Sequence, residues 1–258
     1  MFASEKVIEA SRDFVCIRIE TYENKESEKI VRSLLNGRFA NTAFCIFDPQ
    51  GKKKLTSAGR GPNLLAGRRG EDDDVASVVR RMNKIASRYP RSADLSKAVL
   101  QDFHSFRQAL NVASADQRLL VFVNADENER LPAIENLQQV FSDEEFIGKF
   151  HLDFLNEGDK RWYKTIKSGG KEPGIFVIRS GTFGVDGSAL DRLDLNASAD
   201  EIRKSMVTAS KQFSSDEKRK TYLDHVRQGR RNRIYFENEI PYGEDRDGDG
   251  RIDKGRGR

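Results

Sequence analysis

The sequence predicts an α/β protein with mixed β-sheets flanked by helices. Short apolar runs of strand length alternate with segments whose apolar residues recur at helical spacing, and both halves of the chain show this alternation. Continuous apolar runs are typical of strands that are covered on both faces. With 258 residues, the chain is long enough for two domains of about 100 residues each and a tail.

The first half, residues 1–92, is expected to form a domain that combines strands and helices. The clearest helix is expected over 75–86, where valine, methionine and isoleucine form one apolar stripe. Gly37 is a stop signal for the helix before it. The expected elements are a helix over 4–10, a strand over 14–19, a helix over 25–35, strands over 42–47 and 53–58 joined by a turn at 48–51, and the helix over 75–86.

The second half repeats the arrangement more completely after a helical linker over 93–114. A right-handed crossover makes its first part a parallel βαβ unit, and its two late strands form a hairpin. This domain is expected over 115–213, and a basic helix and charged tail follow over 214–258. Its elements are a strand over 118–124, a helix over 131–141, a strand over 150–155, a helix over 160–166, strands over 174–179 and 190–195, and a helix over 199–213.

This second domain resembles the thioredoxin superfamily. Glu172, Pro173 and Gly174 stand directly before an apolar strand, where that family places a cis-proline, so Pro173 is the cis-proline candidate. The family carries a Cys-x-x-Cys pair at the start of the helix that follows its first strand. Here residues 124–130 contain no cysteine, which excludes disulfide exchange at this position.

The first half resembles a thioredoxin-like domain that is entered midway, so the resemblance implies two thioredoxin-like domains, the first incomplete at its N-terminus. The family's first strand and its cysteine pair would precede Met1, and Asn41 and Thr42 occupy the place of the cis-proline. A start codon assigned too late is the favoured explanation, and it would also remove a signal peptide. The alternative is a degenerate domain whose remaining strands pair differently.

The chain has two cysteines, Cys16 and Cys45, and both lie in apolar runs. Buried cysteine behaves as a small hydrophobic residue, and its spacing here suits neither zinc nor a disulfide framework. The two thiols could approach each other only if their predicted strands were neighbours in a sheet.

A calcium-loop pattern of the form D-x-D-x-D-G-x-x-D lies near the C-terminus. Carboxylates at alternate positions converge on a hard cation, Gly250 permits the sharp turn, and Arg251 can offer its backbone carbonyl. The loop lacks the bidentate glutamate of an EF-hand, because Arg256 stands there, so we expect weak affinity. The alternative is a flexible tail of balanced charge. The candidate ligands are Asp245, Asp247, Asp249, Arg251 and Asp253.

A weak calcium site matters only where calcium is near millimolar, which predicts a periplasmic or extracellular location, with the cytoplasm as the alternative. No stretch of the sequence is apolar enough for a membrane span. The segment 218–233 carries seven Lys and Arg against Asp224, within a chain whose net charge is +4. It is interpreted as a solvated helix, with contact to nucleic acid or an anionic surface as the alternative.

These features predict a redox-inactive, non-catalytic protein that binds or scaffolds an unidentified protein partner, with calcium as its one expected cofactor and no redox cofactor. Two alternatives remain open. One is a thiol-disulfide oxidoreductase whose cysteine pair lies in a missing N-terminal segment. The other is an adaptor that uses the basic segment to bind nucleic acid or an anionic surface.

Overall fold

A computed structural model describes residues 4–17, 19, 21–22, 24–66, 75–89, 100, 102–143, 145–146, 148–216, 221–234 and 238–253. The chain divides into two compact units. The first unit comprises residues 1–91 together with 236–258, and the second comprises residues 92–235. The first unit is therefore built from two parts of the chain that are separated in sequence by the whole of the second unit.

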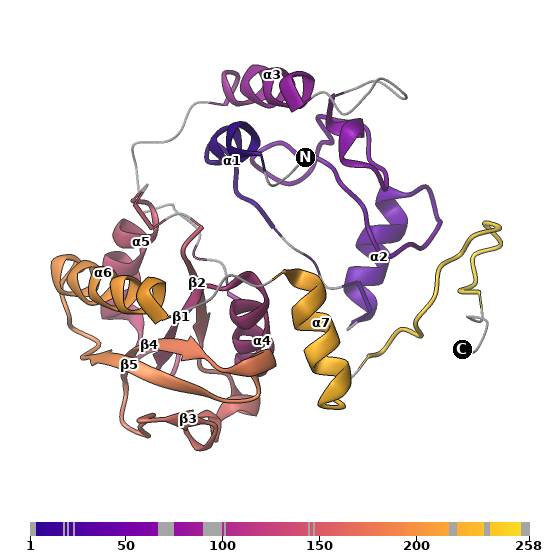
Figure 1. Ribbon diagram of the computed structural model, residues 1–258. Helices are drawn as coiled ribbons and strands as arrows, with labels where there is room; N and C mark the ends of the chain where they lie inside the picture. Colours follow the sequence, from indigo (N-terminus) through magenta and orange to yellow (C-terminus); the bar gives the residue numbers. More distant parts are fainter. Residues whose placement is uncertain are drawn as a thin grey trace. The chain divides into compact units, whose positions relative to one another are not determined.

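The second unit contains one mixed sheet of five strands in the order β2-β1-β4-β5-β3 (Figure 1). Strand β1 (Leu119–Asn124) is buried along its whole length, because it lies between a parallel neighbour, β2 (Phe150–Phe154), and an antiparallel one, β4 (Gly174–Ser180). Strand β4 continues into an antiparallel pair with β5 (Gly187–Leu193), and the short β3 (Ile166–Lys167) adds in parallel to β5. The predicted α/β class with a mixed, helix-flanked sheet is confirmed for this unit.

Helices cover both faces of this sheet (Figure 1). On one face, α5 (Leu131–Phe141) and α6 (Ala199–Asp216) enclose a core with the alternate β1 residues that begin with Leu119. On the other face, α4 (Phe106–Asp116) packs on Leu120 and Phe122. Alternation of side chains along β1 supplies both cores. The unit ends with α7 (Tyr222–Arg231), which begins at a capping box formed by Thr221 and Asp224.

Helices make up most of the regular secondary structure described for the first unit, with α1 (Glu5–Ser11), α2 (Lys25–Leu34) and α3 (Val75–Ala86). Helix α2 forms here because the Asn24 side chain accepts a hydrogen bond from the Ser27 N–H, and the side chain of Glu28 pairs with that of Arg32 one turn later. Helices α1 and α3 share a small core that includes Leu65 of the short helix η1 (Pro62–Ala66).

The strand predicted over 14–19 is wrong for the residues of it that the structure describes. Residues 15–17 have no regular secondary structure, and the side chains of Val15 and Ile17 are 72% and 70% exposed. An apolar run forms a buried strand only where a second strand is available to pair with it. Residues 42–47 and 53–59 do return antiparallel to each other around a turn, but their strand pairing is limited to isolated bridges, Phe44 with Gly59 and Phe47 with Lys54. The second mixed sheet expected over 1–92 is therefore not seen among the described residues of that range.

Three other predicted elements are corrected. The segment 160–166 is not an α-helix: Trp162–Lys164 is a single 3-10 turn and β3 follows it. The helical linker expected over 93–114 has its helix at Phe106–Asp116, and residues 93–99 and 101 of that prediction lie outside the described residues. The strand expected over 190–195 runs from Gly187 to Leu193. In the part of the chain that the structure describes, no helix combines the length and the apolar character needed to cross a membrane.

Candidate functional site

The calcium-loop sequence lies in a segment, 238–253, that is held against the rest of the first unit. The Ile240 N–H donates to the Tyr22 carbonyl at 3.1 Å, and the Asp245 N–H donates to the Phe39 carbonyl at 2.9 Å. Ile240 is buried with Val31 and Phe39. The backbone of the loop is therefore anchored by the segments that flank α2.

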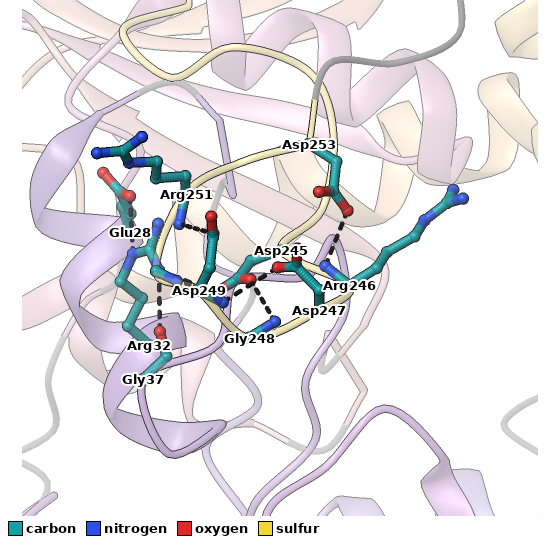
Figure 2. Close-up of polar contacts among 11 residues, drawn as sticks. Glu28, Arg32, Gly37, Asp245, Arg246, Asp247, Gly248, Asp249, Arg251 and Asp253 are labelled. Carbon is teal, nitrogen blue, oxygen red and sulfur yellow. Dashed lines mark hydrogen bonds and ion pairs between the residues drawn. The ribbon is translucent and has the colours of Figure 1, made fainter.

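Asp245, Asp247 and Asp249 bring one carboxylate oxygen each to within 4.8 Å of one another (Figure 2). Hydrogen bonds inside the loop fix this arrangement. Asp245 accepts from the N–H groups of Gly248 at 2.8 Å and Gly250 at 3.2 Å, and Asp247 accepts from the Asp249 N–H at 3.1 Å. Both glycines have positive φ angles, 82° and 86°, which L side chains rarely adopt. Three carboxylate oxygens thus converge at the alternate positions that the motif specifies.

The three carboxylates differ in exposure. Asp245 is 4% exposed, whereas Asp247 and Asp249 lie at the surface. The buried carboxylate of Asp245 is balanced by the Arg32 guanidinium at 3.7 Å, and Arg32 also bonds Glu28 and the Gly37 carbonyl (Figure 2). Like charges held this close repel one another, so a cation placed among them would lower the energy of the loop.

The other two predicted ligands are not part of this carboxylate group. Asp253 accepts a hydrogen bond from the Arg246 N–H at 3.0 Å, and Figure 2 shows its carboxylate turned toward Arg246. The Arg251 N–H donates to Asp249 at 2.7 Å, which closes the turn at the end of the loop. The structure therefore brings together three of the five residues that the motif nominated.

At the place where the resemblance puts a cysteine pair, the structure has an asparagine, Asn124, whose side chain makes several hydrogen bonds. Asn124, at the end of β1, is 5% exposed, and its side-chain oxygen accepts the indole N–H of Trp162 at 3.1 Å. Its amide donates to the carbonyls of Lys171 and Glu172 at 3.0 and 2.9 Å. Asn124 thereby fastens the loop before β4 to the end of β1, and it offers no nucleophile.

Pro173, the cis-proline candidate, closes that same loop. No peptide bond among the described residues is cis, so the bond before Pro173 is trans. The Pro173 carbonyl accepts a hydrogen bond from the Arg192 guanidinium at 2.9 Å. The loop is held by Asn124 and Arg192.

The two thiols have different surroundings. Cys16 is exposed, which corrects the prediction that it is buried in an apolar strand. Cys45 is half-buried beside Thr56, and burial is the main cause that raises its pKa. The two cysteines are not joined in a disulfide. A raised pKa lowers the thiolate fraction of Cys45 near neutral pH and with it the reactivity of that sulfur.

A buried carboxyl group that the sequence did not single out lies on β2. Asp153 is 0% exposed; one of its oxygens accepts the Phe103 N–H at 3.1 Å, and the other has no hydrogen-bond partner among the described residues. Burial is the main cause that raises its pKa to about 7, and the charges of Asp102 and Asp159 also raise it. The bond to Phe103 holds the segment that leads into α4.

The basic segment forms α7 over part of its length. Residues 217–220, which include three of its seven cations, lie outside the described residues. The buried face of α7 packs His225 on the ring of Phe183, with centroids 4.4 Å apart. Arg230, Arg231 and Arg233 are exposed, and Arg227 pairs with Asp224 at 3.6 Å.

Comparison of the chain with protein families, with curated proteins and with solved structures finds no match. The arguments for function therefore depend on the residues and their geometry.

Asn124, Asp153 and Trp162 are the residues that sequence reasoning missed. The sequence offered three signals for them: a single tryptophan, an asparagine at the end of an apolar strand, and an aspartate inside an apolar strand. Each signal identifies a polar group that needs a buried partner.

Proposed function

We propose that the C-terminal segment 238–253 is a calcium-binding loop that fastens this end of the chain to the first unit. The observation that carries the proposal is the convergence of Asp245, Asp247 and Asp249 within a D-x-D-x-D-G turn. Oxygen ligands at alternate positions are the donors that calcium prefers. Asp245 is tied to Phe39 and Arg32, so ion binding at the loop would be coupled to its attachment.

Few charged ligands favour an affinity near the millimolar range that extracellular calcium modules use. We infer that the protein works outside the cytoplasm, in the periplasm or the extracellular space, where calcium reaches such concentrations. Arg32, which already compensates the buried carboxylate, favours weak rather than tight binding, because its charge opposes the entry of a second cation.

Calorimetric titration of the whole chain with calcium tests this proposal. Wild-type protein is expected to give saturable heat at millimolar calcium. Asp247→Asn and Asp249→Asn are expected to weaken binding about tenfold or more, since each removes a ligand charge but keeps an oxygen that can accept the loop hydrogen bond. Calcium is also expected to protect residues 238–253 from limited proteolysis.

Asp194→Asn is the matched control, because Asp194 is an exposed aspartate of the second unit, with 86% of its side chain exposed. Asp253→Asn measures whether the fourth carboxylate joins the ion, and a smaller effect is expected than at Asp247. Absence of heat with wild type, or equal heat with the Asp247 and Asp249 variants, would contradict the proposal.

For the second unit we propose a non-catalytic binding module of the thioredoxin-like class. Support comes from the order of its elements: the βαβ unit β1–α5–β2 precedes the hairpin β4–β5 and α6, and this is the order on which the resemblance rests. Asn124 supports the non-catalytic role, because it fills the end of β1 with a structural amide.

An insulin-reduction assay tests the absence of disulfide chemistry. The protein is expected to give no acceleration over dithiothreitol alone, because Cys16 and Cys45 are its only cysteines and neither lies beside Asn124 in the sequence. Thioredoxin itself serves as the positive control. Reduction that disappears with Cys16→Ser or Cys45→Ser would overturn the proposal and favour an oxidoreductase.

A further inference from the structure

A polar cavity of about 460 Å³ lies in the second unit, at the end of the sheet where β3, β4 and β5 meet. It is open to solvent. The residues at its wall come from the turn before β3 and β3 itself, from the end of β4, from the connection between β4 and β5, and from the start of β5. Its volume is within the range of small-ligand sites, and most of the residues that line it are polar or charged.

Strand register places two cations on opposite sides of this cavity. Ser188 of β5 pairs with Lys167 of β3 on one side and with Arg179 of β4 on the other. Residues that pair directly across neighbouring strands point to the same face of a sheet, and two strand spacings are about 9.6 Å. A short side chain between two long ones leaves a hollow above Ser188, with a positive charge at each side.

The charges and hydroxyls at the wall favour an anion. Lys164 adds a third cation, and Asp186 is the one carboxylate among the lining residues. Arg179 is paired with Asp216 at 3.2 Å, but a guanidinium has five donors and can serve a second acceptor.

We propose that this cavity binds a compact phosphate-bearing ligand. The phosphate lies above Ser188, between Lys167 and Arg179, and the Ser188 hydroxyl donates to it. Arg179 contributes charge-assisted hydrogen bonds from a fixed position, because its guanidinium is also held by Asp216 and lies over the ring of Phe213 at 5.8 Å. Lys164 and Lys167 supply charge from the exposed side.

Calorimetric titration with pyrophosphate at low ionic strength tests this inference, with orthophosphate and a short phosphoserine peptide as parallel arms. Pyrophosphate is expected to bind with an affinity that falls as salt is raised. Lys167→Gln and Arg179→Gln are expected to weaken binding about tenfold each. Asp186→Asn is expected to strengthen binding about threefold, because it removes the opposing charge. Binding by the peptide as well would identify a phosphorylated side chain as a source of the phosphate.

Lys204→Gln is the matched control, since Lys204 is an exposed cation of α6 that does not line the cavity. It is expected to bind pyrophosphate like the wild type. The inference is overturned by absence of binding up to about 10 mM pyrophosphate. It is equally overturned if Lys204→Gln weakens binding as much as Lys167→Gln does, or if Asp186→Asn weakens binding, because both results would indicate nonspecific attraction to a basic surface.

Discussion

Replacing Asp153 by asparagine is expected to remove most of the loss of stability that the second unit undergoes as pH rises from about 4 to about 7. The pKa of this buried carboxyl group is raised from 3.8 to about 7 in the folded state, mainly by burial. The folded state therefore binds the proton more tightly than the unfolded state. Protonated Asp153 therefore stabilises the fold fully at pH values below the pKa that this group has in the unfolded state. This stabilisation is lost as pH rises through the pKa of the folded state.

Linkage gives the size of this effect. Between pH 5 and pH 8 the free energy of unfolding of the wild type is expected to fall by roughly 2–3 kcal/mol through Asp153 alone. The lowered pKa values of Glu201 and Asp224 in the same unit act in the opposite direction, because their contribution is lost as pH falls below the usual aspartate and glutamate range. The pH range in which Glu201 and Asp224 change the stability lies below the range in which Asp153 does, so the two effects can be separated.

Urea unfolding followed by tryptophan fluorescence measures this dependence. Trp162 is the only tryptophan of the chain and lies in the second unit, so the signal reports on that unit. The side-chain amide that Asp153→Asn introduces can still accept the Phe103 N–H through its oxygen. Asp143→Asn is the matched control, because Asp143 is a partly exposed carboxylate of the same unit that accepts the Glu145 N–H at 3.0 Å, and its charge is not among those that raise the pKa of Asp153. If Asp153→Asn unfolds with the same pH slope as the wild type, the assignment to Asp153 is wrong.

Asn124→Ala is expected to lower the free energy of unfolding of the second unit by about 3 kcal/mol or more. The substitution leaves the buried Trp162 N–H without its acceptor and frees the loop that Lys171 and Glu172 belong to. Trp162 packs between Phe122 and Phe176, with ring centroids at 4.8 Å from each, so its position cannot relax to bring the indole N–H to water. A changed tryptophan emission spectrum in the folded state is expected as well.

Asn156→Ala supplies the comparison, because the Asn156 side chain donates a hydrogen bond to the Phe154 carbonyl at 3.0 Å from a half-buried position. Its cost is expected to be about 1 kcal/mol. Equal destabilisation by the two alanine variants would show that Asn124 is an ordinary polar residue and that the loop before β4 is held by other contacts.

The strands and helices at the centre of the second unit could be predicted from sequence, because their local pattern and their environment agree. Strand β1 is apolar at each residue from Leu119 to Val123 and is buried on both faces, and α5 carries a clear apolar stripe. Near the sheet edge, the local sequence pattern agrees less well with the structure that forms. Strand β5 begins with Gly187, Ser188 and Ala189, which carry little strand preference, and pairing with β4 and β3 places them there.

The failures have a common physical cause, which is dependence on distant partners. Residues 14–17 have the composition of a strand, but no segment that the structure describes pairs with them as a neighbouring strand. Trp162 ends the predicted helix over 160–166 because its ring enters the aromatic core and its N–H bonds Asn124, 38 residues earlier.

Within the candidate calcium site, the local spacing placed three carboxylates correctly, since a short turn determines its own geometry. The role of Arg32 depends on a contact with Asp245, which lies near the other end of the chain, and no local pattern contains such a contact.

The division of the first unit into residues 1–91 and 236–258 has a consequence for biosynthesis. Translation reaches the end of the second unit before it reaches Ile240 and Asp245, which complete the contacts of Tyr22 and Phe39. The fold of the second unit needs no residue beyond 235, whereas the earlier part must wait for residues 238–253 to leave the ribosome. Although it is made first, the N-terminal part of the chain consequently stays without its C-terminal contacts throughout the synthesis of the second unit, and during that time it is open to aggregation or proteolysis.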